Sequence, residues 1–166
     1  MQSLLAAVAG FGLLLSFIGH VGLIFGYDFY GKGWPILFVG IFVVWFPTVL
    51  SMRKLGPALQ KKDGWKIALI GAPPFAKQVF YGMFVYAIVN FAAGALGAFE
   101  MKGSGFWRVG SSHAMAFYGA AWALALAAAG RASLGIEWKC ERGHQLTPEA
   151  NFCEECGARA VHREVS

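Results

Sequence analysis

The chain has 166 residues, of which 57% are hydrophobic and only 14% are charged, whereas soluble domains carry about 25% charged residues. This composition excludes an ordinary soluble domain, because the core of a 166-residue domain cannot bury so much apolar surface. The formal net charge of +5 does not favour nucleic-acid binding, because six of the fourteen lysines and arginines fall in segment 53–77, between long apolar runs. Basic residues placed in this way indicate the cytoplasmic side of a membrane and contact with anionic lipid headgroups.

The first apolar run covers residues 3–27, which is enough to cross a bilayer core of about 30 Å as a helix. We interpret this run as an uncleaved transmembrane helix. A secretory signal peptide would carry a basic residue before its apolar part, and that part would be shorter. Gly12, Ser16, Gly19 and His20 share one face of the helix, which lets another helix approach closely and predicts that His20 faces protein.

A polar, glycine-containing turn at 28–33 separates the first span from a second one, which is predicted at 34–52. Trp34 suits a membrane boundary, and Pro47 within the span removes a backbone hydrogen bond and predicts a kink. The basic segment that follows contains an apolar stretch at 64–75. This stretch is too short to cross the bilayer, so it is expected to lie at the membrane surface.

Two further spans are predicted at 78–99 and at 113–130. Asn90 lies near the middle of the third span, where a side-chain amide needs a partner. Its role is either a hydrogen bond between helices or a contact with a substrate or ion. The fourth span begins with His113 and is rich in alanine, which favours close packing of an inward face.

The distribution of basic residues predicts the orientation of the spans. If segment 53–77 is cytoplasmic, it contributes six basic residues and the C-terminal tail five, against three on the other side, namely Lys32, Lys102 and Arg108. Both termini are then cytoplasmic, and the cysteines lie in a reducing compartment. The alanine and glycine content and the short loops favour a bacterial inner membrane.

All three cysteines of the chain lie in the C-terminal tail beside one histidine, in the spacing Cys-x3-His-x8-Cys-x2-Cys. Cys140, His144, Cys153 and Cys156 thus form two short knuckles, each of which presents two ligands to one metal ion. Three sulfurs and one nitrogen suit tetrahedral zinc. Because four protein ligands leave no open position for water or substrate, the spacing predicts a structural ion rather than a catalytic one.

The tail resembles the zinc-ribbon family, in the short form Cys-x-x-Gly-His, a spacer with proline, then Phe-Cys-x-x-Cys-Gly. The matching residues are Cys140, Gly143, His144, Pro148, Phe152, Cys153, Cys156 and Gly157. The resemblance covers only the segment from 138 to 161. It implies a small pair of β-hairpins held by a structural zinc ion. A module of this size has almost no core of its own, so metal binding must supply most of its folding free energy.

The two histidines of the apolar region allow a different use of the membrane domain. His20 and His113 both lie towards the outer side in the predicted topology, and paired histidines from separate helices hold the b-type haem of membrane cytochromes. Haem ligation between the first and fourth spans, another metal or proton role, and simple packing or helix capping all remain open.

The sequence therefore predicts an all-α integral membrane protein, with a four-helix transmembrane bundle at 1–131 and a cytoplasmic β zinc ribbon at 132–166. No nucleophile–base pair, phosphate-binding glycine loop or carboxylate pair is recognisable, so a non-enzymatic adaptor that binds a cytoplasmic protein is favoured. Homo-oligomerisation through the small-residue stripes is a further expectation. The alternative function is a small transporter, a channel or a haem electron carrier that uses His20, Asn90 and His113.

Overall fold

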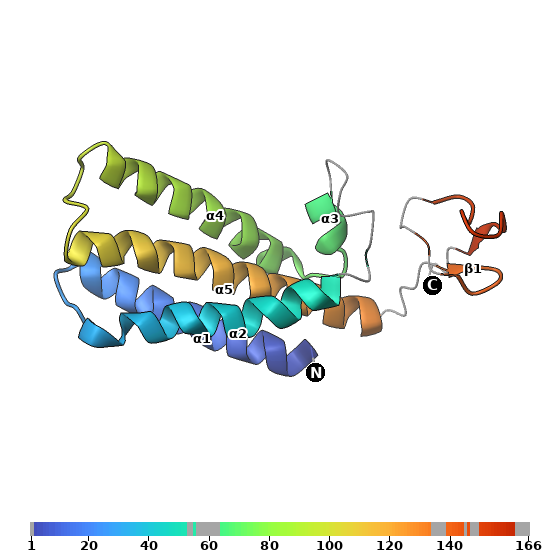
Figure 1. Ribbon diagram of the computed structural model, residues 1–166, viewed down its shortest axis with the longest axis horizontal. Coiled ribbons are helices and arrows are strands. Elements are labelled where there is room, and N and C mark those ends of the chain that lie inside the picture. The colour runs from blue at the N-terminus through green and yellow to red at the C-terminus, as the bar shows by residue number, and fades with distance from the viewer. Residues whose placement is uncertain are drawn as a thin grey trace.

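The computed structural model describes residues 2–52, 55, 64–133, 139–144, 146 and 150–161. Its four long helices are α1 (Gln2–Ile24), α2 (Trp34–Met52), α4 (Pro74–Ala95) and α5 (Ser104–Ser133) (Figure 1). The shorter elements are η1 (Gly31–Gly33), α3 (Gly64–Ala68), β1 (Lys139–Cys140) and β2 (Ala160–Val161). All four long helices are long and apolar enough to cross a membrane. The prediction of an integral membrane protein with four spans is thereby supported.

Helix α5 is the centre of the bundle, and α1, α2 and α4 each pack against it. In Figure 1, α5 runs between α4 on one side and the α1–α2 pair on the other. The alanine-rich sequence explains this position, because small side chains let three neighbours approach one helix closely. The outward faces of α1, α2 and α4 carry large exposed apolar side chains, among them Phe11, Phe42 and Ile88, as expected for surfaces in contact with lipid.

Tyr118 of α5 shows how the small-residue stripes are used. Its hydroxyl donates a hydrogen bond of 2.8 Å to the carbonyl oxygen of Leu37 in α2. Gly12 of α1 and Gly40 of α2 lie against the same side chain, and a Cβ atom at either glycine would overlap it. The stripe on α1 therefore packs within the chain, so it no longer argues by itself for homo-oligomerisation.

Three of the four predicted spans differ from the structure at their boundaries. Helix α1 ends at Ile24 rather than at 27. Helix α4 runs from Pro74 to Ala95 instead of 78–99, because Pro73 and Pro74 start the helix, a position in which proline is favourable. Helix α5 begins at Ser104 rather than at 113, so most of the predicted polar loop is helical. Trp107 explains the extension, because its ring stacks on that of the fully buried Trp34 at 5.8 Å.

The loops place segment 64–73 at the same end of the bundle as the C-terminus of α5, and Figure 1 shows the N-terminus at that end too. Arg131 near the end of α5 fixes this arrangement. Its Nη1 atom donates hydrogen bonds to the carbonyl oxygens of Ala68 at 2.7 Å and Ile70 at 2.8 Å. Four of the basic residues on which the predicted orientation depends, Arg53, Lys54, Lys61 and Lys62, lie outside the described residues. Pro47 lies inside α2 as predicted.

Candidate functional site

The first knuckle of the candidate metal centre begins at the end of β1. Cys140 is the last residue of that strand, and the turn after it is closed by a hydrogen bond of 2.8 Å from the N–H of Gly143 to the carbonyl of Cys140. Gly143 has φ +84°, a conformation that glycine adopts without steric cost. The turn brings His144 back beside Cys140, whose sulfur accepts the backbone N–H of His144 at 3.3 Å.

The second knuckle has the same construction. The N–H of Gly157 donates to the carbonyl of Cys153 at 2.8 Å, and the N–H of Cys153 donates to the carbonyl of Ala158 at 2.8 Å. Gly157 takes φ +68°, so this turn too depends on glycine. Cys153 and Cys156 are thus presented from one tight turn, three positions apart.

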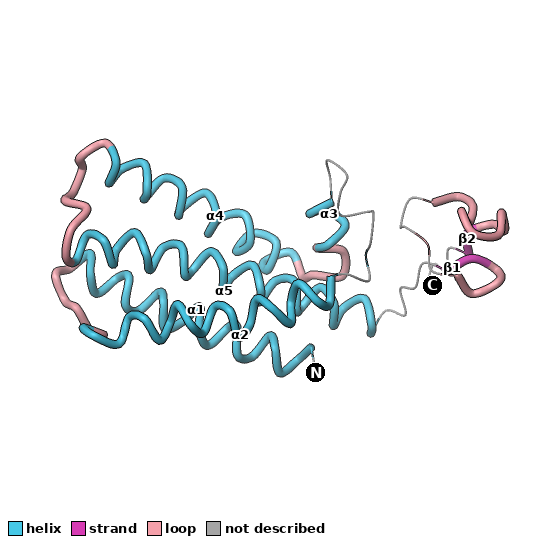
Figure 2. The backbone as a smooth tube through the Cα atoms, in the orientation of Figure 1, coloured by secondary structure: helices cyan, strands magenta, loops and turns pink. Residues whose placement is uncertain are grey.

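Backbone pairing joins the two knuckles. Strands β1 and β2 are antiparallel, with Cys140 opposite Ala160. A further bridge, between Phe152 and Arg159, closes the second knuckle itself. Among the residues that the structure describes, Figure 2 shows strand structure only in the small pair of segments β1 and β2. Within the described residues, the strands are shorter than the hairpin pair that a zinc-ribbon resemblance implies. Trp138 and Pro148, which belong to that resemblance, lie outside the described part of the chain.

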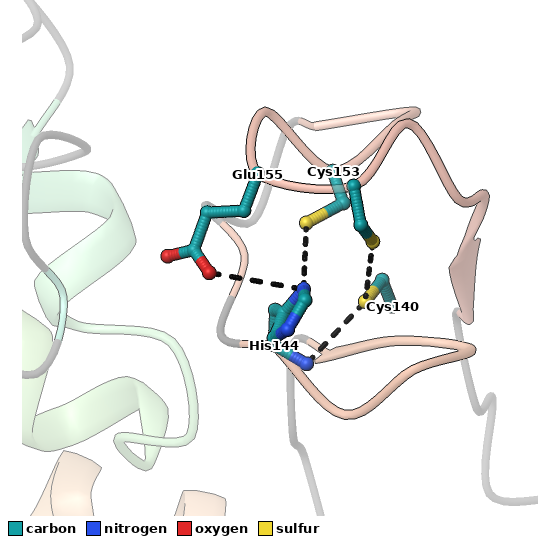
Figure 3. A network of polar contacts seen from close by, with 5 residues as sticks. Cys140, His144, Cys153 and Glu155 are labelled. Carbon is teal, nitrogen blue, oxygen red and sulfur yellow. Dashed lines mark hydrogen bonds and ion pairs between the residues drawn. The ribbon is translucent and has the colours of Figure 1, made fainter.

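The structure brings all four predicted ligands together. One donor atom from each of Cys140, His144, Cys153 and Cys156 lies within 4.8 Å of every other, close enough to bind a metal ion. The sulfurs of Cys140 and Cys156 are 3.7 Å apart, and the sulfur of Cys153 is 3.5 Å from His144 Nδ1 (Figure 3). A tetrahedral ion with metal–sulfur bonds of about 2.3 Å and a metal–nitrogen bond of about 2.0 Å requires about 3.8 Å and about 3.5 Å, respectively. The donor set therefore fits a tetrahedral metal.

The centre has a closed side and an open side. Cys140 and Cys153 are only 3% and 4% exposed, whereas the side chain of His144 is 39% exposed. Desolvation works against ionisation of Cys140, but backbone N–H groups of His144 and Arg142 that bond its sulfur outweigh this effect and lower the pKa of the thiol. A sulfur that favours the thiolate form is suited to bind a cation.

His20 lies at the centre of a polar cluster inside the helical bundle and is 2% exposed, as predicted for an inward-facing residue. Its Nδ1 is 2.8 Å from the hydroxyl of Ser111 in α5, and its Nε2 is 2.6 Å from the hydroxyl of Tyr86 in α4. Ser111 itself donates to the carbonyl of Arg108 at 2.9 Å. The Ser111 hydroxyl must therefore accept from Nδ1–H, which leaves Nε2 to accept from Tyr86 in a neutral imidazole.

Asn90 makes the hydrogen bond between helices that was one of its two predicted roles. Its amide nitrogen donates to Ser112 Oγ at 3.1 Å and to the carbonyl of Arg108 at 3.2 Å, both in α5. Ser112 in turn donates to the carbonyl of Val109 at 2.7 Å. Asn90 is 4% exposed, so its amide is satisfied inside the protein.

His113 is separated from the cluster around His20. It lies well inside α5, not at the start of a helix, and its Nδ1 is 2.9 Å from the carbonyl of Val109. Its ring contacts Phe91 edge-on. Ser111 and His113 point about 200° apart around the helix, so the structure does not bring His113 and His20 together as a pair of ligands.

Sequence reasoning missed the partners of His20. Neither Tyr86 nor Ser111 was predicted to contact it. The four-residue spacing of Tyr86 and Asn90 was the available signal, because such residues share a helix face. No family model, curated protein or solved structure matches this chain. Its function must therefore be argued from the site itself.

Proposed function

We propose that this protein is a membrane-anchored adaptor whose C-terminal module is folded around one structural zinc ion. The observation that carries the proposal is the set of four donor atoms at tetrahedral distances, contributed by two glycine-containing knuckles. Three thiolates and one imidazole in tetrahedral geometry suit zinc, and they also suit iron. Zinc is favoured because thiolates and a neutral imidazole are its common structural ligands.

A non-enzymatic role is favoured by the ligand count. Four protein donors complete a tetrahedral sphere, so the ion has no free position at which to polarise a substrate or activate water. The surface of the module offers a means of binding instead. Phe152 is 58% exposed and forms a backbone bridge with the exposed residue Arg159; Arg142 and Glu154 of the same module are exposed as well. Exposed aromatic and arginine side chains are common anchors in protein interfaces.

The cytoplasmic placement of the module belongs to the same proposal. It is supported by the excess of basic residues in segment 53–77 and in the tail and by the free state of all three cysteines. Reporter fusions at Gly97 and at Ser166 would test it. We expect the fusion at Ser166 to report the cytoplasm and the fusion at Gly97 the opposite side of a bacterial inner membrane.

An adaptor and the alternative, a transporter, channel or electron carrier, differ in which substitutions should abolish function. We expect crosslinking of the intact protein to its partner in cells to be lost in Cys153→Ala and Phe152→Ser and kept in His20→Ala. Metal content would be measured on the same preparations, with one zinc per chain expected in all but Cys153→Ala. Activity that survives Cys153→Ala and fails in His20→Ala would instead favour a transporter or an electron carrier.

A further inference from the structure

Glu155 lies between the two cysteines of the second knuckle, and its carboxylate approaches the metal centre. Its Oε2 atom is 3.8 Å from Nδ1 of His144. The same nitrogen is 3.5 Å from the sulfur of Cys153, so it is the ring nitrogen that faces the ligand cluster. Figure 3 shows the carboxylate directed at this atom from outside the ring of ligands.

The contact is not a hydrogen bond, because 3.8 Å is too long. It is also not an ion pair when metal is bound, since a nitrogen that ligates a metal carries no proton. In that state the positive charge nearest to the Glu155 carboxylate is the metal ion itself. A ligand oxygen and Nδ1 on the same zinc ion would be separated by about 3.4 Å, so a small side-chain rotation brings Glu155 into bonding range.

The exposure of the ligands shows where an ion can enter and leave. The buried residues Cys140 and Cys153 close one side of the centre. On the opposite side, the side chain of His144 is 39% exposed and that of Glu155 is 74% exposed. This exposed side gives an ion a route to solvent. Among the described residues, Glu155 is the carboxylate that contacts the cluster there.

We propose that Glu155 is a transient fifth ligand through which the centre exchanges its metal. Zinc accepts a fifth ligand without loss of the other four. In the release step, the bond from the carboxylate oxygen to the metal forms, the bond from His144 Nδ1 breaks, and the imidazole leaves as a neutral group. The ion is then held by three thiolates and Glu155 and is open to a competing ligand. The inference rests on the metal centre of the proposed function, and it makes the module responsive to the supply of free metal.

Metal transfer from the full-length, zinc-loaded protein in detergent to a chromophoric chelator tests this role. The variants are Glu155→Gln, which keeps the shape and removes the ligating charge, and Glu154→Gln, which removes the neighbouring exposed charge. Loss of one outer-shell partner commonly changes metal binding by about 10-fold or more. We expect Glu155→Gln to slow transfer by about fivefold or more and Glu154→Gln to stay near the wild-type rate.

Three outcomes contradict parts of the inference in distinguishable ways. Equal rates in Glu155→Gln and wild type, with one metal bound per chain, overturn the role of Glu155 and leave the metal centre intact. Equal slowing in both variants shows that only the local negative charge matters. Absence of bound metal before the chelator is added overturns the centre itself and the inference with it.

A second measurement detects the fifth ligand directly. In His144→Ala, we expect Glu155 to take the vacated position, so cobalt(II) still binds one per chain with a tetrahedral visible spectrum. The double variant His144→Ala with Glu155→Gln is expected to lose that spectrum, whereas His144→Ala with Glu154→Gln keeps it. If both double variants behave alike, Glu155 does not ligate the ion.

Discussion

The ring nitrogen Nε2 of His20 in α1 lies 2.6 Å from the hydroxyl of Tyr86 in α4. Both helices pack along α5, and this contact connects them to each other. The hydroxyl of Tyr86 donates a hydrogen bond to His20 Nε2, and the Nδ1–H group of His20 donates one to Ser111. The three side chains therefore form one directed hydrogen-bond chain across three helices. Its direct effect is to fix the relative register of α1, α4 and α5.

Removing the Tyr86 hydroxyl is expected to weaken the bundle. In Tyr86→Phe the buried Nε2 of His20 loses its donor, at a cost of about 1–2 kcal/mol of unfolding free energy. The control is Tyr81→Phe, which removes a hydroxyl from a 47% exposed residue of the same helix and should cost about 0.5 kcal/mol or less. Unfolding in mixed micelles measures both. Equal losses would show that the hydrogen bond contributes nothing specific.

Adding a methyl group at Gly12 or Gly40 is expected to displace Tyr118. Both substitutions to alanine place a Cβ on the tyrosine side chain, and such overpacking costs about 1–3 kcal/mol. Gly82→Ala in α4 is the matched control, because nothing lies within 4 Å of its Cβ position and alanine favours the helix. A Cβ atom at Gly40 would meet the hydroxyl of Tyr118, and Tyr118→Phe removes that hydroxyl. The double variant Gly40→Ala with Tyr118→Phe should therefore lose less stability than the two single variants added together. Additive losses would contradict this contact.

Arg131 is expected to control how firmly segment 64–73 is held against α5. Arg131→Gln removes two charge-assisted hydrogen bonds to backbone carbonyls, each worth about 1.5 kcal/mol or more. Hydrogen exchange of the amides of 64–72 should become at least about tenfold faster, while exchange in α1 stays unchanged. Unchanged exchange in 64–72 would mean that apolar packing alone holds the segment.

Removal of the metal is expected to unfold the C-terminal module and leave the bundle intact. The module contains only the two short strands β1 and β2 among its described residues, so its folding depends on the ion. After treatment with a chelator, amides of 151–160 should lose their protection, and Cys156→Ser should show the same loss without treatment. The thermal unfolding of the helical bundle is the internal control. Protection that persists without metal would contradict a structural role for the ion.

Asp28 is expected to make stability depend on pH in the acid range. Its Oδ1 accepts hydrogen bonds from the N–H of Gly31, from Trp34 Nε1 and from the N–H of Tyr30, and these, led by that from Gly31, lower the pKa of the carboxyl below its ordinary 3.8. A lowered pKa in the folded state means that the stabilisation is present above pH 3.8 and is lost as pH falls through the folded value. Asp28→Asn should flatten this part of a stability–pH profile. An unchanged profile would locate the acid sensitivity elsewhere.

The sequence was sufficient for features that depend on local pattern. Long apolar runs predicted four spans, the small-residue face predicted the burial of His20, and cysteine spacing predicted the cluster of ligands. The start of α5 was not predictable in this way, because the polar and glycine residues of 100–110 resemble a loop. They become helical through the stacking of Trp107 on Trp34, a contact between residues far apart in the chain.

The partners of the functional residues required the tertiary structure for the same reason. Whether His20 meets Tyr86, Ser111 or His113 depends on the relative register of three helices, which a single sequence does not specify. The approach of the Glu155 carboxylate to His144 likewise depends on how the two knuckles pair through β1 and β2, with Cys140 opposite Ala160. Both features depend on long-range contacts rather than on periodicity.

The central position of α5 has a consequence for how this protein assembles. Helices are synthesised in chain order, so α1, α2 and α4 enter the membrane before the helix that all three pack against. The acceptors for the Nδ1–H group of His20 and for the amide of Asn90 arrive only with Ser111 and Ser112 of α5. The bundle therefore cannot close until its last span is inserted, and the metal-binding segment follows that span in the chain.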